Sequence, residues 1–191
     1  MRRRTLLQAS GATLALSLAG CITRSSSTGD LTISSAAFTD GGTFPRRFSC
    51  DGRGISPPLT VESTPDTTAA LAVVGRSTVG VLDNPTLWTC WNIPADTTEI
   101  PAALPRTETL ESLGGARQGT AGDREPGYRP LCPPPGQSYA HWVQMYALDT
   151  ELDTAAGTEN DDALEAIEGA QIASDRITAG YTRAGTPTAR E

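Results

Sequence analysis

The sequence contains no lysine and a single histidine, His141, among its 191 residues. All 15 basic side chains are therefore arginines, and they stand against 22 acidic ones for a net charge of −7. Beyond the arginines at positions 2–4, no segment concentrates positive charge, so the chain lacks the basic stripe that neutralises nucleic-acid phosphates, and we expect no nucleic-acid partner. An acidic chain without lysine is typical of halophilic archaea; a high genomic GC content is the alternative explanation.

The same scarcity bears on metal sites and catalysis. The four cysteines form no Cys-x-x-Cys pair, and one histidine cannot complete a tetrahedral zinc site with them. The chain also lacks a phosphate-binding loop and a Gly-x-Ser-x-Gly elbow. A Ser-His-Asp set is conceivable only around His141, because such triads are spatial and not sequential. We expect no metal, no cofactor and no enzymatic activity.

The first 21 residues have the features of an export signal. Three arginines at positions 2–4 precede an apolar run over 6–19, which is shorter than the ~20 residues that span a bilayer. The run ends in Leu-Ala-Gly-Cys, which resembles a lipobox and would leave Cys21 to carry the lipid. Arg-Arg-Thr-Leu-Leu resembles a twin-arginine signal. An ordinary Sec signal with a chance cysteine is the alternative.

Residues 22–30 are predicted to be a flexible tether between this anchor and the domain. We expect an exported protein that is held at the cell-surface membrane by its lipid. Removing the signal takes away three arginines and no acid, so the net charge of the mature chain falls to −10. About 170 residues remain, which is enough for one domain with a sizeable core.

Strand-length apolar runs dominate the rest of the chain. They cover residues 71–74, 86–93 and 141–148, and proline and glycine separate them. In the last run, both alternating faces are largely apolar. These patterns predict a sandwich-like β protein with long connecting loops.

One helix is predicted after the third run. Thr158 stands three residues before Asp161 in a capping-box-like start, and Leu164, Ile167 and Gln171 follow at helical spacing. Residues 151–168 carry many acids and no base, which we interpret as a solvated face.

Four segments resemble, in order, motifs of the prokaryotic phosphatidylethanolamine-binding protein family, also called Raf kinase inhibitor-like. They are Phe-Ser-Cys-Asp-Gly with Ile-Ser-Pro-Pro-Leu (48–59), Trp-Asn-Ile-Pro (91–94), Gly-Tyr-Arg with Cys-Pro-Pro-Pro-Gly (127–136), and Tyr-Ala-Leu-Asp (146–149). The resemblance covers residues 31–183 and leaves 184–191 as a disordered tail. It implies a mainly β fold, an antiparallel β-sandwich with a few peripheral helices that include one near the C-terminus.

The resemblance also implies a small pocket for phosphate-like anions and phospholipid headgroups. In the family this pocket uses an Asp-Pro-Asp-Ala-Pro loop, a strand histidine, a Cys-Pro-Pro loop and a His-Arg-Tyr segment. Here the acidic loop falls on residues 77–81, which contain no acid, and the strand histidine falls on Leu87. The third segment is Tyr139-Ala140-His141, as if histidine and tyrosine had exchanged places.

The candidate ligand-binding residues follow from this comparison: Arg76, Leu87, Cys132, Pro133, Pro134, Tyr139 and His141. Arg76 would donate to an anion through its guanidinium, and Asp83 would orient His141. A solvated arginine, an ordinary turn and a core histidine are the alternatives. Pro133 and Pro134 are expected to form a pocket wall, and Trp88 and Trp91 to lie in the core.

The family arrangement brings Cys50 and Cys132 toward the same end of the domain. A disulfide between them would close an 82-residue loop and stabilise the fold by about 4 kcal/mol in the chain-entropy model. Two free thiols are the alternative. Cys90 is expected to be a small buried hydrophobe.

These features together predict an exported binding or inhibitory protein of this family with an altered pocket. One alternative is that a small anion or lipid headgroup is still bound through a rebuilt pocket. Another is a cell-surface lipoprotein with a vestigial pocket, whose loops contact an unknown envelope protein. The fold alone does not choose among them.

Overall fold

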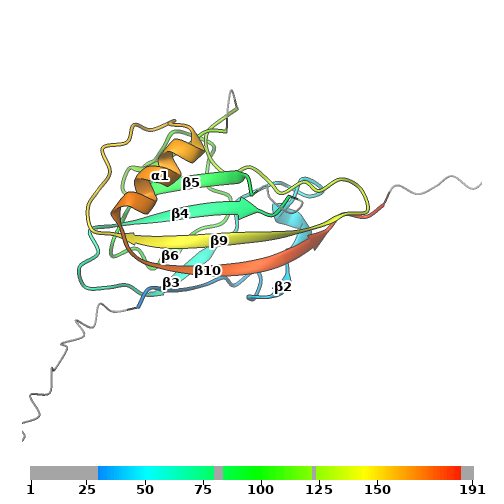
Figure 1. The fold of residues 1–191 in the computed structure, drawn as a ribbon, viewed down its shortest axis with the longest axis horizontal. Coiled ribbons are helices and arrows are strands. Elements are labelled where there is room, and N and C mark those ends of the chain that lie inside the picture. Colours follow the sequence, from blue (N-terminus) through cyan, green and yellow to red (C-terminus); the bar gives the residue numbers. More distant parts are fainter. Residues whose placement is uncertain (1–29, 80–83, 122–123, 186–191) are drawn as a thin grey trace, which may run out of the picture.

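Figure 1 shows a computed structural model that describes residues 30–79, 84–121 and 124–185. In these ranges the chain is mainly β, with one α-helix close to the C-terminal end. The elements are β1 (Thr32–Ser34), β2 (Gly42–Thr43), η1 (Arg46–Phe48), β3 (Leu59–Ser63), β4 (Ala70–Ser77), β5 (Thr86–Pro94), β6 (Glu99–Ile100), β7 (Thr109–Leu110), η2 (Glu111–Leu113), β8 (Ala116–Gln118), β9 (Ser138–Leu148), α1 (Asn160–Ala170) and β10 (Gln171–Thr182).

The strands form two sheets. The larger has the order β2-β10-β9-β4-β5-β8-β7, and the smaller has the order β1-β3-β6. Neighbouring strands are antiparallel except for β2 and β10, which pair in parallel. The expected sandwich is therefore confirmed, with one parallel pair at the edge of an otherwise antiparallel sheet. The three apolar runs are confirmed as the central strands β4, β5 and β9.

The central strands bury both of their faces. Along β9, Val143 and Met145 point into the main core between the sheets, whereas Tyr146 and Leu148 belong to a second cluster beneath α1. Helix α1 contributes Leu164 and Ile167 to that second cluster, and Figure 1 shows it lying across the sheet at β4 and β5. Apolar residues on both faces of one strand explain why its sequence shows no polar side.

The start of α1 differs from the expectation. Its first residue is Asn160, and its N-cap residue, Glu159, makes no side-chain capping bond. The hydroxyl of Thr158 donates instead to the carbonyl of Ala155 at 2.7 Å, so the expected capping box is wrong. The Asn160 side chain accepts a buried hydrogen bond from Thr89 of β5 at 2.8 Å, which fixes this end of the helix to the sheet. Gln171, expected in the helix, begins β10.

The Trp-Asn-Ile-Pro motif has a structural role at the end of β5. Asn92 has a φ of 55°, a left-handed conformation that asparagine tolerates better than most residues. Its side chain accepts from the Leu152 N–H at 2.8 Å and donates to the Leu152 carbonyl at 2.9 Å. This paired contact ties the loop after β9 to β5. The Asn of the motif is therefore explained by packing and does not indicate a ligand.

The predicted export signal, the lipobox at Cys21 and nearly all of the tether lie outside the described residues. Within the described part of the chain, no helix is long and apolar enough to cross a membrane.

Candidate functional site

A small pocket opens where β4 ends and where β5 and β9 begin; we call it the strand-end pocket. Its volume is about 140 Å³, less than the 300–1,000 Å³ typical of sites for drug-sized ligands. The residues around it are mostly apolar: Ser77, Val79, Pro85, Leu87, Arg129, Pro130, Leu131, Cys132 and Tyr139. Arg129 is the one charged side chain among these described lining residues, which include no acid and no histidine.

Backbone hydrogen bonds hold the walls of the strand-end pocket in place. The Arg129 N–H donates to the carbonyl of Leu87 at 3.0 Å, which attaches segment 129–132 to the start of β5. The Thr78 N–H donates to the carbonyl of Ala140 at 2.9 Å, which joins the end of β4 to β9. Cys50 supports the segment from behind, because its N–H donates to the Leu131 carbonyl at 3.1 Å. The walls are thus preformed.

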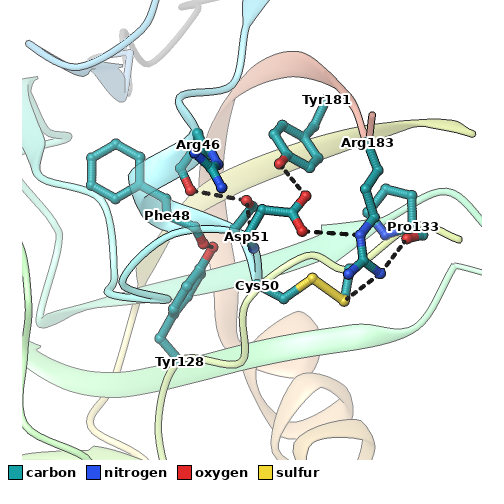
Figure 2. The surroundings of a disulfide bond; sticks show 10 residues. Arg46, Phe48, Cys50, Asp51, Tyr128, Pro133, Tyr181 and Arg183 are labelled. Carbon is teal, nitrogen blue, oxygen red and sulfur yellow. Dashed lines mark hydrogen bonds and ion pairs between the residues drawn. A yellow bond between two sulfur atoms is a disulfide. The ribbon is translucent and has the colours of Figure 1, made fainter. Parts of the chain in front are cut away.

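A disulfide links the lining residue Cys132 to Cys50. Cys50 and Cys132 are bonded with their Cα atoms 5.3 Å apart, in the arrangement that the resemblance implies. Figure 2 shows Arg183 beside the bond: its guanidinium donates to Asp51 at 3.0 Å, to the Pro133 carbonyl at 3.2 Å and to the Cys132 sulfur at 3.5 Å. Arg183, which directly follows β10, thereby contacts both the Cys132 sulfur and Asp51, the neighbour of Cys50.

Asp51 is the anchor of that network. The Tyr181 hydroxyl donates to Asp51 at 2.6 Å, and Arg183 forms an ion pair with it at 3.0 Å. The hydrogen bond from Tyr181 lowers the pKa of the Asp51 carboxyl below its usual value; partial burial opposes this effect, and the charge of Arg183 adds to it. Asp51, which belongs to the Cys-Asp-Gly motif, therefore has a structural role and does not line the strand-end pocket.

Three of the seven candidate residues do line the strand-end pocket, namely Leu87, Cys132 and Tyr139. Pro133 and Pro134, expected as a wall, are not among the lining residues. Their carbonyls accept from Arg183 and from the Gln137 N–H, respectively, so they shape the turn that follows the wall.

Arg76 lies away from the strand-end pocket. Its guanidinium donates to the Asn84 carbonyl at 3.1 and 2.8 Å and lies 5.9 Å from the ring of Trp142. Arg76 and Trp142 are register partners in β4 and β9 and share the outer face of the sheet. Because the Arg76 side chain lies on the outer face and is not among the residues that line the pocket, the expectation that it donates to an anion there is corrected. Asp83 lies outside the described residues.

His141 is a core residue. It is fully buried, and its ring packs edge-on against Phe44 with centroids 4.6 Å apart. Neither ring nitrogen has a hydrogen-bond partner in the described structure. Burial lowers the pKa of His141 to about 4, although the adjacent backbone of Arg76 opposes the shift. The expected ligand role of His141 is therefore corrected to that of a neutral residue in the core.

Both strand tryptophans are core residues, as expected. The Trp88 indole N–H donates to Gln118 at 2.9 Å, and that of Trp91 donates to the Thr154 carbonyl at 3.3 Å. Cys90 is a buried free thiol, and burial raises its pKa above the usual range. The described residues include no cluster of His, Cys, Asp and Glu that would hold a metal ion.

Several pocket residues were not among the candidates: Ser77, Val79, Pro85, Arg129, Pro130 and Leu131. Arg129 belongs to the Gly-Tyr-Arg motif, which was a usable signal. For Ser77, Val79 and Pro85 the strand ends were the signal, because residues that terminate adjacent strands meet at one edge of a sheet, whereas Pro130 and Leu131 lie in a loop.

The strand-end pocket offers a small group a mostly apolar lining, with Arg129 and Tyr139 as its potential side-chain hydrogen-bond donors. A phosphate placed there would leave water for surroundings dominated by leucine, valine and proline. Such desolvation is unfavourable unless charge-assisted hydrogen bonds replace the lost water contacts.

The comparisons with known proteins agree with this architecture. The family model for phosphatidylethanolamine-binding proteins matches residues 34–182. A UPF0098 protein of Methanothermobacter thermautotrophicus is 35% identical over 147 residues, which cover 77% of this chain and 95% of the relative. A UPF0098 protein of Pyrococcus horikoshii is 31% identical over 173 residues, with 90% and 86% coverage.

Two crystal structures are similar in fold. A phosphatidylethanolamine-binding protein homologue of Chlamydia trachomatis has a TM-score of 0.68 at 26% identity and covers 81% of this chain and 98% of its own. Escherichia coli YbcL, described as a member of the mammalian family, has a TM-score of 0.72 at 24% identity, with 81% and 99% coverage. The chain therefore belongs to the phosphatidylethanolamine-binding protein family.

Proposed function

We propose that this chain is an exported, lipid-anchored binding protein whose strand-end pocket accepts a small uncharged group in place of a phosphate. The observation that supports this proposal most directly is the lining of the pocket. Leu87 stands where the family has a histidine, Leu131 also lines the pocket, and none of the described lining residues carries a carboxylate. A neutral group gains from burial against these side chains, whereas a phosphate dianion loses its hydration.

The alternative of a rebuilt anion site in the strand-end pocket required Arg76 and His141 to face a ligand. Arg76 is engaged with Asn84 and Trp142, and His141 lies in the core against Phe44. Neither side chain reaches the pocket, so we do not retain this alternative.

Tyr139 provides a test of the neutral-ligand proposal. Tyr139→Ala removes a partly buried ring from the wall, and we expect it to weaken binding of a small neutral alcohol such as 1-butanol at least several-fold in calorimetric titration. Trp142→Ala is the matched control, because Trp142 is a partly buried aromatic of the same strand on the opposite face. Equal weakening by both variants, or no saturable alcohol binding by the wild type, would count against the proposal.

The anchoring part of the proposal has its own test. We expect wild-type protein in the membrane fraction and Cys21→Ser in the soluble fraction, because the substitution removes the thiol that would carry the lipid. Ser25→Ala, four residues further along the tether, is the control and should stay with the membrane. Membrane association of Cys21→Ser at the wild-type level would refute the lipid anchor.

A further inference from the structure

A second and larger cavity adjoins the strand-end pocket; we call it the arginine pocket. Its volume is about 660 Å³, within the range of small-molecule sites. It shares Arg129, Pro130 and Cys132 with the strand-end pocket, so the same segment of chain forms a wall of both. Three arginines and one acid contribute to its lining: Arg106, Arg124, Arg129 and Glu125.

The arginine pocket concentrates positive charge in an acidic protein. Its described lining residues include three arginines and one glutamate, although acidic residues outnumber basic ones by 22 to 15 in the whole chain. The ion pair found among the described residues is that of Arg183 with Asp51, so none of the three arginines is neutralised by a described carboxylate at salt-bridge distance. Like charges at one site repel, and a bound anion would relieve that repulsion.

Hydrogen bonds within the protein hold the frame of the arginine pocket. Arg106 donates to the Gly54 carbonyl at 3.1 Å, which holds part of its guanidinium and leaves its other N–H groups for a ligand. Gly54 has a φ of 62°, and a Cβ there would lie 3.2 Å from Pro130, so the chain packs closely behind this arginine. Tyr128 also lines the pocket, and its hydroxyl donates to the Phe48 carbonyl at 2.9 Å beside the disulfide. Preformed walls reduce the ordering cost of binding.

We propose that the arginine pocket binds a small molecule carrying two or more negative charges on phosphate or carboxylate oxygens. Planar guanidiniums form bidentate, charge-assisted hydrogen bonds with both groups. Three arginines around one cavity favour a ligand with several charged oxygens over a monovalent ion, and among the described lining residues Glu125 is the one carboxylate that offsets them. This inference does not require any particular ligand in the strand-end pocket, although Arg129 lines both pockets.

The probes are pyrophosphate and citrate, titrated calorimetrically into the mature chain at low ionic strength, because salt screens exposed charges. We expect saturable binding of at least one probe. Arg124→Gln should weaken it about tenfold or more, as one lost charge-assisted hydrogen bond implies. Arg106→Gln should act similarly, and circular dichroism of both variants checks that the fold is retained. Binding of pyrophosphate alone assigns a phosphate ligand, and binding of citrate alone assigns a carboxylate ligand.

Arg176→Gln is the matched control, because Arg176 is an exposed arginine near Trp142 on the outer face of the sheet. It should leave the affinity for the probe unchanged. Absence of saturable binding by the wild type, or equal weakening by Arg176→Gln and Arg124→Gln, overturns the proposal. In either case the test of Tyr139 and the neutral alcohol is unaffected.

Discussion

Replacing Cys50 and Cys132 together by serine is expected to lower the free energy of unfolding by about 4 kcal/mol, because an 82-residue loop is no longer closed in the unfolded chain. For a domain of this size, that loss corresponds to a fall in Tm of roughly 8–16 °C. The contact of Arg183 with the Cys132 sulfur disappears as well. Thermal unfolding followed by circular dichroism measures the effect.

A reducing agent provides the control for the disulfide. It should lower the Tm of the wild type toward that of the double serine variant and leave the variant unchanged. Cys90 is a buried free thiol in both proteins, so its contribution cancels in the comparison. Free alkylation of Cys50 and Cys132 in the unfolded, unreduced wild type would contradict the pairing.

Acid should destabilise the fold well before the carboxylates titrate. The pKa of His141 is about 4 in the folded chain against 6.5 when unperturbed, because burial disfavours the imidazolium. The unfolded chain therefore binds more protons between these values, and stability falls as the pH drops below 6.5. The full loss, reached below pH 4, is on the order of 3 kcal/mol. Above pH 6.5 this contribution is fully present.

No other histidine contributes to this pH dependence, since His141 is the chain's single histidine. Denaturant unfolding at pH 7 and at pH 5 should show the loss in the wild type and little of it in His141→Leu, which keeps an apolar side chain against Phe44. Asp51, whose pKa is lowered from 3.8, contributes only at lower pH. If the free energy of unfolding of His141→Leu fell between pH 7 and pH 5 by as much as that of the wild type, the assignment to His141 would be contradicted.

The central strands could be predicted from the sequence because burial on both faces produces continuous apolar runs, as in β4, β5 and β9. Strand β10 could not, since much of it is polar or exposed and it follows α1 without a break. Its Asp175 illustrates the difficulty: the carboxylate accepts from the Ile33 N–H at 2.9 Å, a contact between segments 142 residues apart. A contact with a residue so distant in the chain produces no local sequence pattern from which the strand could be predicted.

The pocket was predictable only in part. Tyr139 and His141 have the same parity in β9, yet the first lies at the rim and the second two residues deeper, where Phe44 covers it. Parity assigns a face of the sheet and does not say how far along the strand the core begins. Arg76 could have been assigned to the outer face, because it alternates with Ser77, which lines the pocket. Loop residues such as Pro130 have no periodicity to place them.

The central claim is that the strand-end pocket holds an uncharged group and not a phosphate. The most direct measurement is amide chemical-shift mapping of the wild type at pH 7, with phosphorylethanolamine and 1-butanol titrated separately. We predict that the butanol titration shifts the amides of Leu87, Leu131 and Tyr139, and that phosphorylethanolamine leaves those of Leu87 and Tyr139 unchanged whatever it does at Arg106 and Arg124. Saturable shifts of Leu87 and Tyr139 with phosphorylethanolamine, at equal or higher affinity than with butanol, would contradict the claim.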